Sequence, residues 1–180
     1  MNKTFELLPL NECHLKMVLD WRNEPAVRKN MYTSHEISFP EHKSWFDSLA
    51  GNKTKAYFIA VIDGVESGVL GFSDINSVKG IATWAFYTSP TAKRGSGSLM
   101  EFYALDYAFN KLNLHKLKCE VLSFNQAVVK MHCKFGFIVE GQHRDAFFDG
   151  SKYHDIVHLG VFSSEWNEMR PLMQKKLRIE

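Results

Sequence analysis

The segment from Trp84 to Phe109 constrains the fold most, because a strand, a glycine-containing loop and a helix follow one another within it. β-Branched and aromatic residues up to Tyr87 predict the strand, and Ser89-Pro90 interrupts its pairing. The loop that follows is small and basic and consists of Arg94, Gly95, Ser96, Gly97 and Ser98. Beyond it, apolar residues recur at helical spacing, at Leu99, Phe102, Leu105 and Phe109. The sequence therefore predicts a helix that begins at or just after the loop.

A helix N-terminus that follows a glycine-containing loop is suited to holding an anion. The first backbone N–H groups of a helix have no partner within it, and glycines let the backbone approach a phosphate closely. Arg94 adds positive charge at the mouth of this loop. No Gly-Lys-Ser/Thr follows, which excludes a P-loop, and the third glycine of a dinucleotide-binding fingerprint is missing. A plain strand-to-helix turn is the alternative.

Length and composition favour a single domain over residues 1–180. A chain of 180 residues can bury a substantial core, and its 14 Phe and 4 Trp residues can fill that core. The net charge of +2 and the lack of a basic run argue against a nucleic-acid partner.

The cysteines and the N-terminal segment predict a cytoplasmic protein. Cys13, Cys119 and Cys133 are odd in number, scattered and without Cys-x-x-Cys spacing, so we expect reduced thiols. The first residues, MNKTFELLPL, contain no long apolar core or cleavage site, which indicates neither export nor membrane insertion. His154 and His158 are four residues apart in a predicted strand without an acidic or cysteine cluster, so no metal is expected.

Periodicity and turn residues predict the other elements. Strands are expected over residues 5–8, 55–62, 68–75, 81–87, 117–122, 138–147 and 153–161. Asn11 is the expected N-cap of a helix to about residue 22, and Ser38 and Glu41 form the capping box of a second helix. A short helix after Asn125 is stopped by Gly136, and a basic amphipathic helix begins at residue 164. The order indicates a mixed α/β fold with the glycine loop near its centre.

The region between the first two helices combines aromatic, sulfur-containing and cationic side chains. The candidate ligand-binding residues are Arg22, Met31, Tyr32, His42 and Trp45. Such a set suits a flat ring and a phosphate. As an alternative, Met31 and Trp45 are ordinary core residues.

The order of elements and two motifs resemble the GNAT superfamily of acyl-CoA N-acyltransferases. That superfamily's loop pattern, Gln/Arg-x-x-Gly-x-Gly/Ala, is matched by Arg94 and Gly97, while Leu99 departs from it. Asn125 followed by a short helix and Gly136-Phe137 resembles the superfamily's Asn…Tyr…Gly-Phe segment, with His132 where tyrosine is usual. The resemblance covers nearly the whole chain. It implies an acetyl-CoA-dependent N-acetyltransferase with a mixed, mostly antiparallel sheet flanked by helices.

Within the superfamily, Trp21-Arg22-Asn23, Met31-Tyr32, His42 and Trp45 resemble one bacterial branch. Its enzymes acetylate the 4-amino group of UDP-4-amino-4,6-dideoxy-N-acetyl-β-L-altrosamine in pseudaminic acid biosynthesis, which serves flagellin or surface glycan modification. The segment from Glu140 to Asp155 is also similar to that of ribosomal-protein N-terminal and polyamine acetyltransferases. These activities, and a non-catalytic acyl-CoA-binding module, are the alternatives. A homodimer is compatible with the resemblance, and no membrane partner is expected.

The resemblance also implies roles for individual residues. The pyrophosphate of acetyl-CoA would contact the N–H groups from Arg94 to Ser98, and its pantetheine arm would bind Phe86-Tyr87 and Asn125. Glu120, on the face of its strand opposite the apolar side chains, is the candidate base, with a solvated carboxylate as the alternative. His132 is the candidate acid that protonates the departing thiolate, with a core histidine as the alternative.

Overall fold

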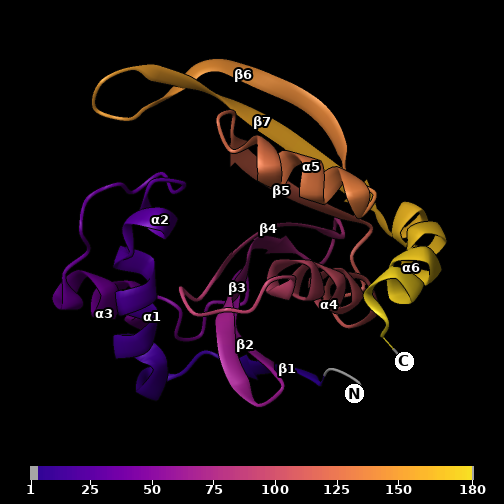
Figure 1. Cartoon of the computed structure of the whole chain (residues 1–180), viewed down its shortest axis with the longest axis horizontal. Helices are drawn as coiled ribbons and strands as arrows, with labels where there is room; N and C mark the ends of the chain where they lie inside the picture. The colour runs from indigo at the N-terminus through magenta and orange to yellow at the C-terminus, as the bar shows by residue number, and fades with distance from the viewer. Residues whose placement is uncertain (1–3, 180) are drawn as a thin grey trace.

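The computed structural model describes residues 4–179, which form a seven-stranded sheet with helices on both faces (Figure 1). The strands are β1 (Phe5–Pro9), β2 (Ala56–Ile62), β3 (Val65–Asn76), β4 (Ile81–Thr88), β5 (Lys116–Leu122), β6 (Ile138–Phe148) and β7 (Tyr153–Phe162). Their spatial order is β1-β2-β3-β4-β5-β7-β6, and every neighbouring pair is antiparallel except β4 and β5. The expected mixed, mostly antiparallel fold is confirmed.

The single parallel pair, β4 and β5, stays together over only three residue pairs. Residues 81–83 of β4 lie opposite residues 116–118 of β5. Beyond this point β4 remains paired with β3 as far as Thr88, and β5 remains paired with β7 as far as Leu122. Each strand therefore follows its own antiparallel neighbour, and the two halves of the sheet diverge (Figure 1).

Helices before β2 pack on one face of the sheet, and the later helices pack on the other. The first group comprises η1 (Glu12–His14), α1 (Leu15–Asn23), α2 (Pro25–Arg28) and α3 (Phe39–Asp47). The later group comprises α4 (Ser96–Asn110), α5 (Gln126–Lys134) and α6 (Ser163–Leu177). Val18 of α1 contacts Ile59 and Val69 on the first face. The larger core on the second face includes Phe102 of α4 and Trp166 of α6.

The predicted elements occur with small shifts and a few local differences. Asn11 caps η1, which leads into α1, and the chain continues after Pro25 as the short α2. Ser38 accepts the Glu41 N–H as predicted, but the Glu41 carboxylate binds His35 instead of completing the capping box. The long helix α4 begins at Ser96, inside the predicted loop, because Gly95 has a φ of 93° and ends the loop.

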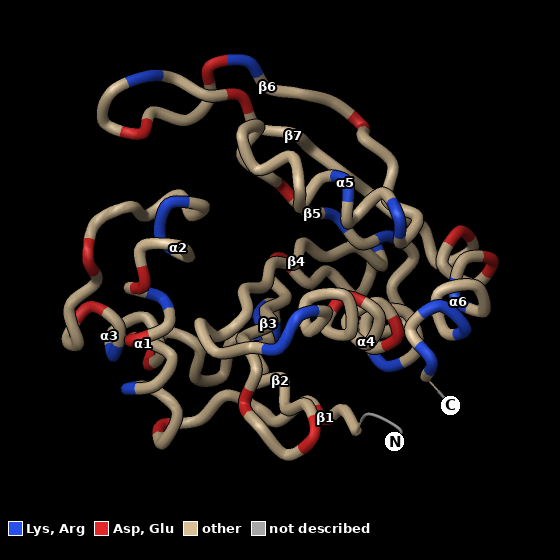
Figure 2. Tube along the Cα trace, in the orientation of Figure 1, with Lys and Arg blue, Asp and Glu red and all other residues tan. Residues whose placement is uncertain are grey.

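Charge is distributed without strong asymmetry. Figure 2 shows Lys and Arg interspersed with Asp and Glu along the chain, in keeping with the net charge of +2. Among the described residues, none of the helices combines the length and apolar character required to cross a membrane.

One partly buried ion pair joins the two long helices of the second face. Asp106 of α4 accepts hydrogen bonds from Nε and Nη2 of Arg170, both at 2.8 Å, and from Nε1 of Trp166 at 3.0 Å. The side chain of Asp106 is 18% exposed, so a bidentate, charge-assisted contact of this kind stabilises the α4–α6 packing.

We predict that Asp106→Ala lowers the free energy of unfolding by about 2–3 kcal/mol, because it removes charge-assisted bonds and leaves Trp166 without its acceptor. Asp20→Ala is the matched control. Asp20 pairs with Lys16 on an exposed helix surface, so we expect a loss below about 0.5 kcal/mol. Urea denaturation measures both values. Equal losses in the two variants would contradict the assigned role of Asp106.

Candidate active site

A groove opens where β4 and β5 diverge. Residues 84–88 of β4 form one wall, residues 119–122 of β5 form the other, and α5 covers one side. Within residues 4–179, the ladder between β4 and β5 ends at residue 83, so the edge of β4 that faces the groove has no strand partner. Backbone N–H and C=O groups on such an edge can bind an extended ligand.

The N-terminus of α4 lies at this groove. Gly97, in the first turn of α4, lines the groove together with Thr88. The Ser96 N–H donates to the Lys93 carbonyl and the Leu99 N–H donates to the Gly95 carbonyl, while the N–H groups between them belong to the unpaired first turn of the helix. This turn is suited to binding a phosphate.

Asn125 lines the groove from the opposite side. It is the N-cap residue of α5, but in the part of the chain that the structure describes its side chain makes no capping hydrogen bond. The amide is therefore available to a ligand in the groove.

A tyrosine holds Glu120 at the mouth of the groove, and a histidine lies close to it. Its Oε2 accepts the hydroxyl of Tyr32 at 2.6 Å, and its Oε1 lies 3.6 Å from Nδ1 of His158. Burial, reinforced by the bond to Glu120, raises the pKa of Tyr32, so this hydroxyl remains a donor. Glu120 is exposed and lines the groove, as expected for a side chain on the polar face of β5.

His132 lies inside the groove wall. It is buried, and its Nδ1 lies 2.7 Å from Oε1 of Glu101, a fully buried residue of α4. The ring also packs against Trp84, Phe86 and Phe137. The His132 side chain lines the groove and is also buried, so its surroundings have features of a site residue and of a core histidine.

A second cavity, of about 330 Å³, adjoins the groove. Its wall is mainly apolar and aromatic, with Met31, Ile37, Trp45, Tyr57, Val69 and Tyr87. Met31 and residues 85–87 of β4 line both the cavity and the groove, so a ligand in one can reach a ligand in the other.

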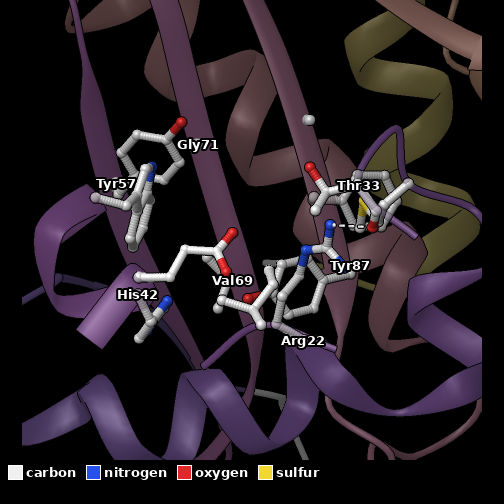
Figure 3. A pocket seen from close by; sticks show the side chains of 13 residues that line it. Arg22, Thr33, His42, Tyr57, Val69, Gly71 and Tyr87 are labelled. Carbon is white, nitrogen blue, oxygen red and sulfur yellow. Dashed lines mark hydrogen bonds between the residues drawn. The ribbon is translucent and has the colours of Figure 1, made fainter. Parts of the chain in front are cut away.

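The partly buried Arg22 and the buried His42 each place an unsatisfied nitrogen atom in this cavity. Figure 3 shows Arg22 beside Tyr87, with Nη2 donating to the Thr33 carbonyl at 3.0 Å. Within residues 4–179, Nη1 of Arg22 and Nε2 of His42 are buried without a hydrogen-bond partner. Burial lowers the pKa of both side chains. Unpaired buried polar atoms are costly, so their concentration in one cavity indicates a ligand that satisfies them.

The structure brings most of the predicted site residues together. The groove collects Phe86, Tyr87, Gly97, Glu120, Asn125 and His132, and the cavity collects Arg22, Met31, His42 and Trp45. Tyr32 is 52% exposed and contacts Glu120 and Phe147 instead of lining the cavity. Arg94 and Gly95 are exposed in the turn before α4, and Ser96 and Ser98 belong to its first turn.

Two residues of the site escaped the sequence analysis. Tyr57 packs edge-on against Trp45 with ring centroids 5.0 Å apart, and nothing in the pattern of β2 marks it. Glu101 could have been found from the sequence, because it is a carboxylate within the apolar run of α4. A carboxylate buried in such a run requires a hydrogen-bonding partner. The described residues contain no group of three or more His, Cys, Asp or Glu arranged to hold a metal ion.

Residues 5–138 match the family model described as "Acetyltransferase (GNAT) domain". This chain therefore belongs to the GNAT family and is an acetyl-CoA-dependent acetyltransferase. It is 26% identical over 162 residues to the spermidine N(1)-acetyltransferase of Escherichia coli K12, an alignment that covers 89% of this chain and 87% of that protein. It is 28% identical over 148 residues to the acetyltransferase PseH of Campylobacter jejuni, which covers 82% and 92% of the two chains.

A solved structure of Vibrio cholerae spermidine N-acetyltransferase, in complex with CoA and spermine, shares the fold. The TM-score is 0.85 at 22% identity, with 91% of this chain and 98% of that chain covered. The residues of the groove in the present chain fit acetyl-CoA. An open strand edge suits the amides of the pantetheine arm, and an uncapped helix N-terminus suits the pyrophosphate.

We predict that Gly97→Val weakens acetyl-CoA binding by at least about tenfold without unfolding the protein. A Cβ at this position would lie 3.5 Å from Phe86 and 3.9 Å from Met131, which are ordinary contacts, so the side chain fits the fold but occupies the groove. Isothermal titration gives the dissociation constant, and thermal denaturation reports folding.

Gly141→Val is the matched control, because a Cβ there meets nothing within 4 Å and the residue lies in β6, away from the groove. An unchanged dissociation constant in a folded Gly97→Val protein would remove the first turn of α4 from the cofactor site.

Proposed function

We propose that the chain transfers the acetyl group of acetyl-CoA to the 4-amino group of a UDP-linked amino sugar, UDP-4-amino-4,6-dideoxy-N-acetyl-β-L-altrosamine. The supporting observation is the chemistry of the cavity beside the groove. Arg22 offers an unpaired guanidinium nitrogen to an anionic or carbonyl oxygen, and Trp45 and Met31 offer apolar surface to a ring or a methyl group. This function belongs to pseudaminic acid biosynthesis, and the similarity to PseH agrees with it.

The charge of the cavity is poorly suited to a polycation. Among the described residues, Glu41 is the single carboxylate in the cavity wall, and that carboxylate is bound to His35. The partly buried Arg22 in the same wall would repel an ammonium group. These features favour an acceptor that carries negative charge away from the reacting amine.

The second candidate is polyamine N-acetylation. The similarity to spermidine N(1)-acetyltransferase covers 89% of this chain, slightly more than the similarity to PseH. Glu120 and Glu41 would be the carboxylates nearest to a cationic acceptor in the groove and the cavity.

The proposed mechanism uses residues on both sides of the groove. Acetyl-CoA supplies the activated acetyl group as a thioester. Glu120 removes the proton of the acceptor amine, directly or through a water molecule, and a backbone N–H of β4 near Tyr87 polarises the thioester carbonyl. His132 gives a proton to the departing sulfur. Arg22, Met31, His42 and Trp45 hold the acceptor, and Tyr32 orients Glu120.

Comparison of substrates tests the proposal. The protein is incubated with acetyl-CoA and either the UDP-amino sugar, the same amino sugar without UDP, or spermidine, and products are detected by mass spectrometry. The proposal predicts that the nucleotide sugar is acetylated with the highest kcat/KM. Preferential acetylation of spermidine would establish the second candidate, and equal rates for the sugar with and without UDP would remove the nucleotide from the recognition.

We predict that Arg22→Ala lowers kcat/KM for the UDP-amino sugar by about tenfold to a hundredfold, the range of one lost charge-assisted hydrogen bond. The KM for acetyl-CoA should remain nearly unchanged, because Arg22 lines only the acceptor cavity. Steady-state kinetics with each substrate varied gives both constants. A parallel rise in both KM values would mean that the Arg22–Thr33 bond serves only to hold the loop after α2.

We predict that Glu120→Gln lowers kcat by about 10²–10⁴, since glutamine retains the size of the side chain and its bond to Tyr32 but cannot accept a proton. Glu140→Gln is the matched control. Glu140 binds Lys116 on β5 and is outside the groove lining, so its variant should retain full turnover. Wild-type activity in Glu120→Gln would exclude Glu120 as the base and favour Asp74 or direct loss of the proton to water.

A further inference from the structure

The pair formed by Glu101 and His132 is the most deeply buried ionisable contact of the groove. Glu101 is 0% exposed and His132 is 3% exposed, and their nearest oxygen and nitrogen atoms are 2.7 Å apart. The residues come from α4 and α5, which both contribute side chains to the core on the second face of the sheet. The second oxygen of Glu101, Oε2, is buried and has no hydrogen-bond partner within residues 4–179.

Packing alone does not explain a carboxylate at this position. Its neighbours on α4, Met100 and Phe102, are apolar and fully buried, and an apolar residue would satisfy the same core. Exchange of a buried ion pair for apolar side chains is often neutral or stabilising, so such a pair is weak support for stability. Burial raises the pKa of Glu101, and the hydrogen bond from His132 opposes this shift. The Glu101–His132 pair therefore adds little to stability, although it is buried where the groove meets the core.

The described residues around His132 leave only one ring nitrogen, Nε2, free to contact a ligand. Trp84, Phe86 and Phe137 surround the ring with centroid distances of 5.5, 6.2 and 5.2 Å. Nδ1 is engaged by Glu101, while Nε2 has no partner within residues 4–179, and the residue lines the groove. The imidazole is therefore fixed at one nitrogen and can act through the other, as in sites where a base or acid is oriented by a third group.

We propose that Glu101 is a positioning residue that orients His132 and supplies the counter-charge for its proton. The proposal rests on the proposed role of His132 as the acid. Before the reaction, the Glu101–His132 pair has no net charge and holds two protons. One proton is on Nε2 and the other is shared between Nδ1 and the carboxylate. As the amine nitrogen bonds to the acetyl carbon and the C–S bond breaks, the sulfur keeps the bonding electron pair and His132 gives it the Nε2 proton.

The proton count closes over one turnover. The pair is left with one proton, on Nδ1, hydrogen-bonded to the Glu101 carboxylate. Glu120 has meanwhile accepted one proton from the amine. Net return of a proton from Glu120 to His132 through solvent restores both groups, so no further reactant is required.

The first test uses Glu101→Gln, which preserves the shape of the side chain and a hydrogen bond to Nδ1. Glutamine cannot supply the counter-charge for the imidazole, so single-turnover acetyl transfer should slow by about tenfold to a hundredfold with an unchanged KM for acetyl-CoA. Met100→Leu is the control for a disturbed core, since Met100 is equally buried on α4. It should leave the rate unchanged. Equal rates in wild type and Glu101→Gln would overturn the proposal.

The second test is a double-mutant cycle with His132→Phe. If Glu101 acts only through His132, Glu101→Gln has no further effect on the rate in the His132→Phe background. Additive losses would show an independent structural effect and overturn the proposal. A wild-type rate in folded His132→Phe would instead refute the role of His132 itself, while a slow His132→Phe beside a fast Glu101→Gln would refute only the role of Glu101. His132→Tyr should recover part of the lost rate.

The third test needs no substrate. Proton and nitrogen NMR of the free protein, with His132 assigned from the His132→Phe spectrum, should show a strongly hydrogen-bonded Nδ1 proton in wild type. This signal should shift to that of a weaker hydrogen bond in Glu101→Gln and stay unchanged in Met100→Leu. A His132 spectrum identical in wild type and Glu101→Gln would contradict the pairing.

Discussion

The early end of the pairing between β4 and β5 is the constraint on which the rest of the site depends. Each of these strands is bound along its length to an antiparallel neighbour, β3 or β7, whereas the contact between them covers three residue pairs. Within residues 4–179, the divergence leaves part of β4 without a neighbour on one side. A strand in the middle of a sheet is normally hydrogen-bonded on both sides. Helix α4 begins beside that opening and α5 covers it, so the strand edge, the helix N-terminus, Glu120 and His132 converge there.

Buried polarity in this protein is concentrated around that opening. Arg22, His42, Trp84, Glu101 and His158 all contain buried polar atoms without a partner in the part of the chain that the structure describes, and all contact the groove, the cavity or a residue that lines them. Unsatisfied polar atoms lower stability. Their concentration at one site is expected if bound ligands satisfy these polar atoms. The core elsewhere is closed by apolar packing and by the Asp106–Arg170 link.

The groove and the cavity are separated by the arrangement of the sheet. The groove lies between the two halves of the sheet, while the cavity lies on the side of α1 and α3, and β4 with Met31 forms the boundary between them. If the groove holds acetyl-CoA and the cavity holds the acceptor, as proposed, a change in the helices before β2 would alter the acceptor and leave the cofactor groove unchanged. The chain is comparably similar to a spermidine acetyltransferase and to PseH, at 26–28% identity.

The sequence alone determined the elements and the family. Apolar spacing placed Leu99, Phe102, Leu105 and Phe109 in the core, and Asp63-Gly64, with φ of 53° and 76°, forms the predicted two-residue hairpin turn. These features depend on neighbours within a few residues, so local patterns reveal them. The tertiary structure alone decided that Tyr32 reaches Glu120, 88 residues away, that Glu101 meets His132, and that Arg22 lies beside Tyr87. Contacts of this kind depend on where β4 and β5 separate. The periodicity within one element contains no information about how distant elements are placed relative to each other.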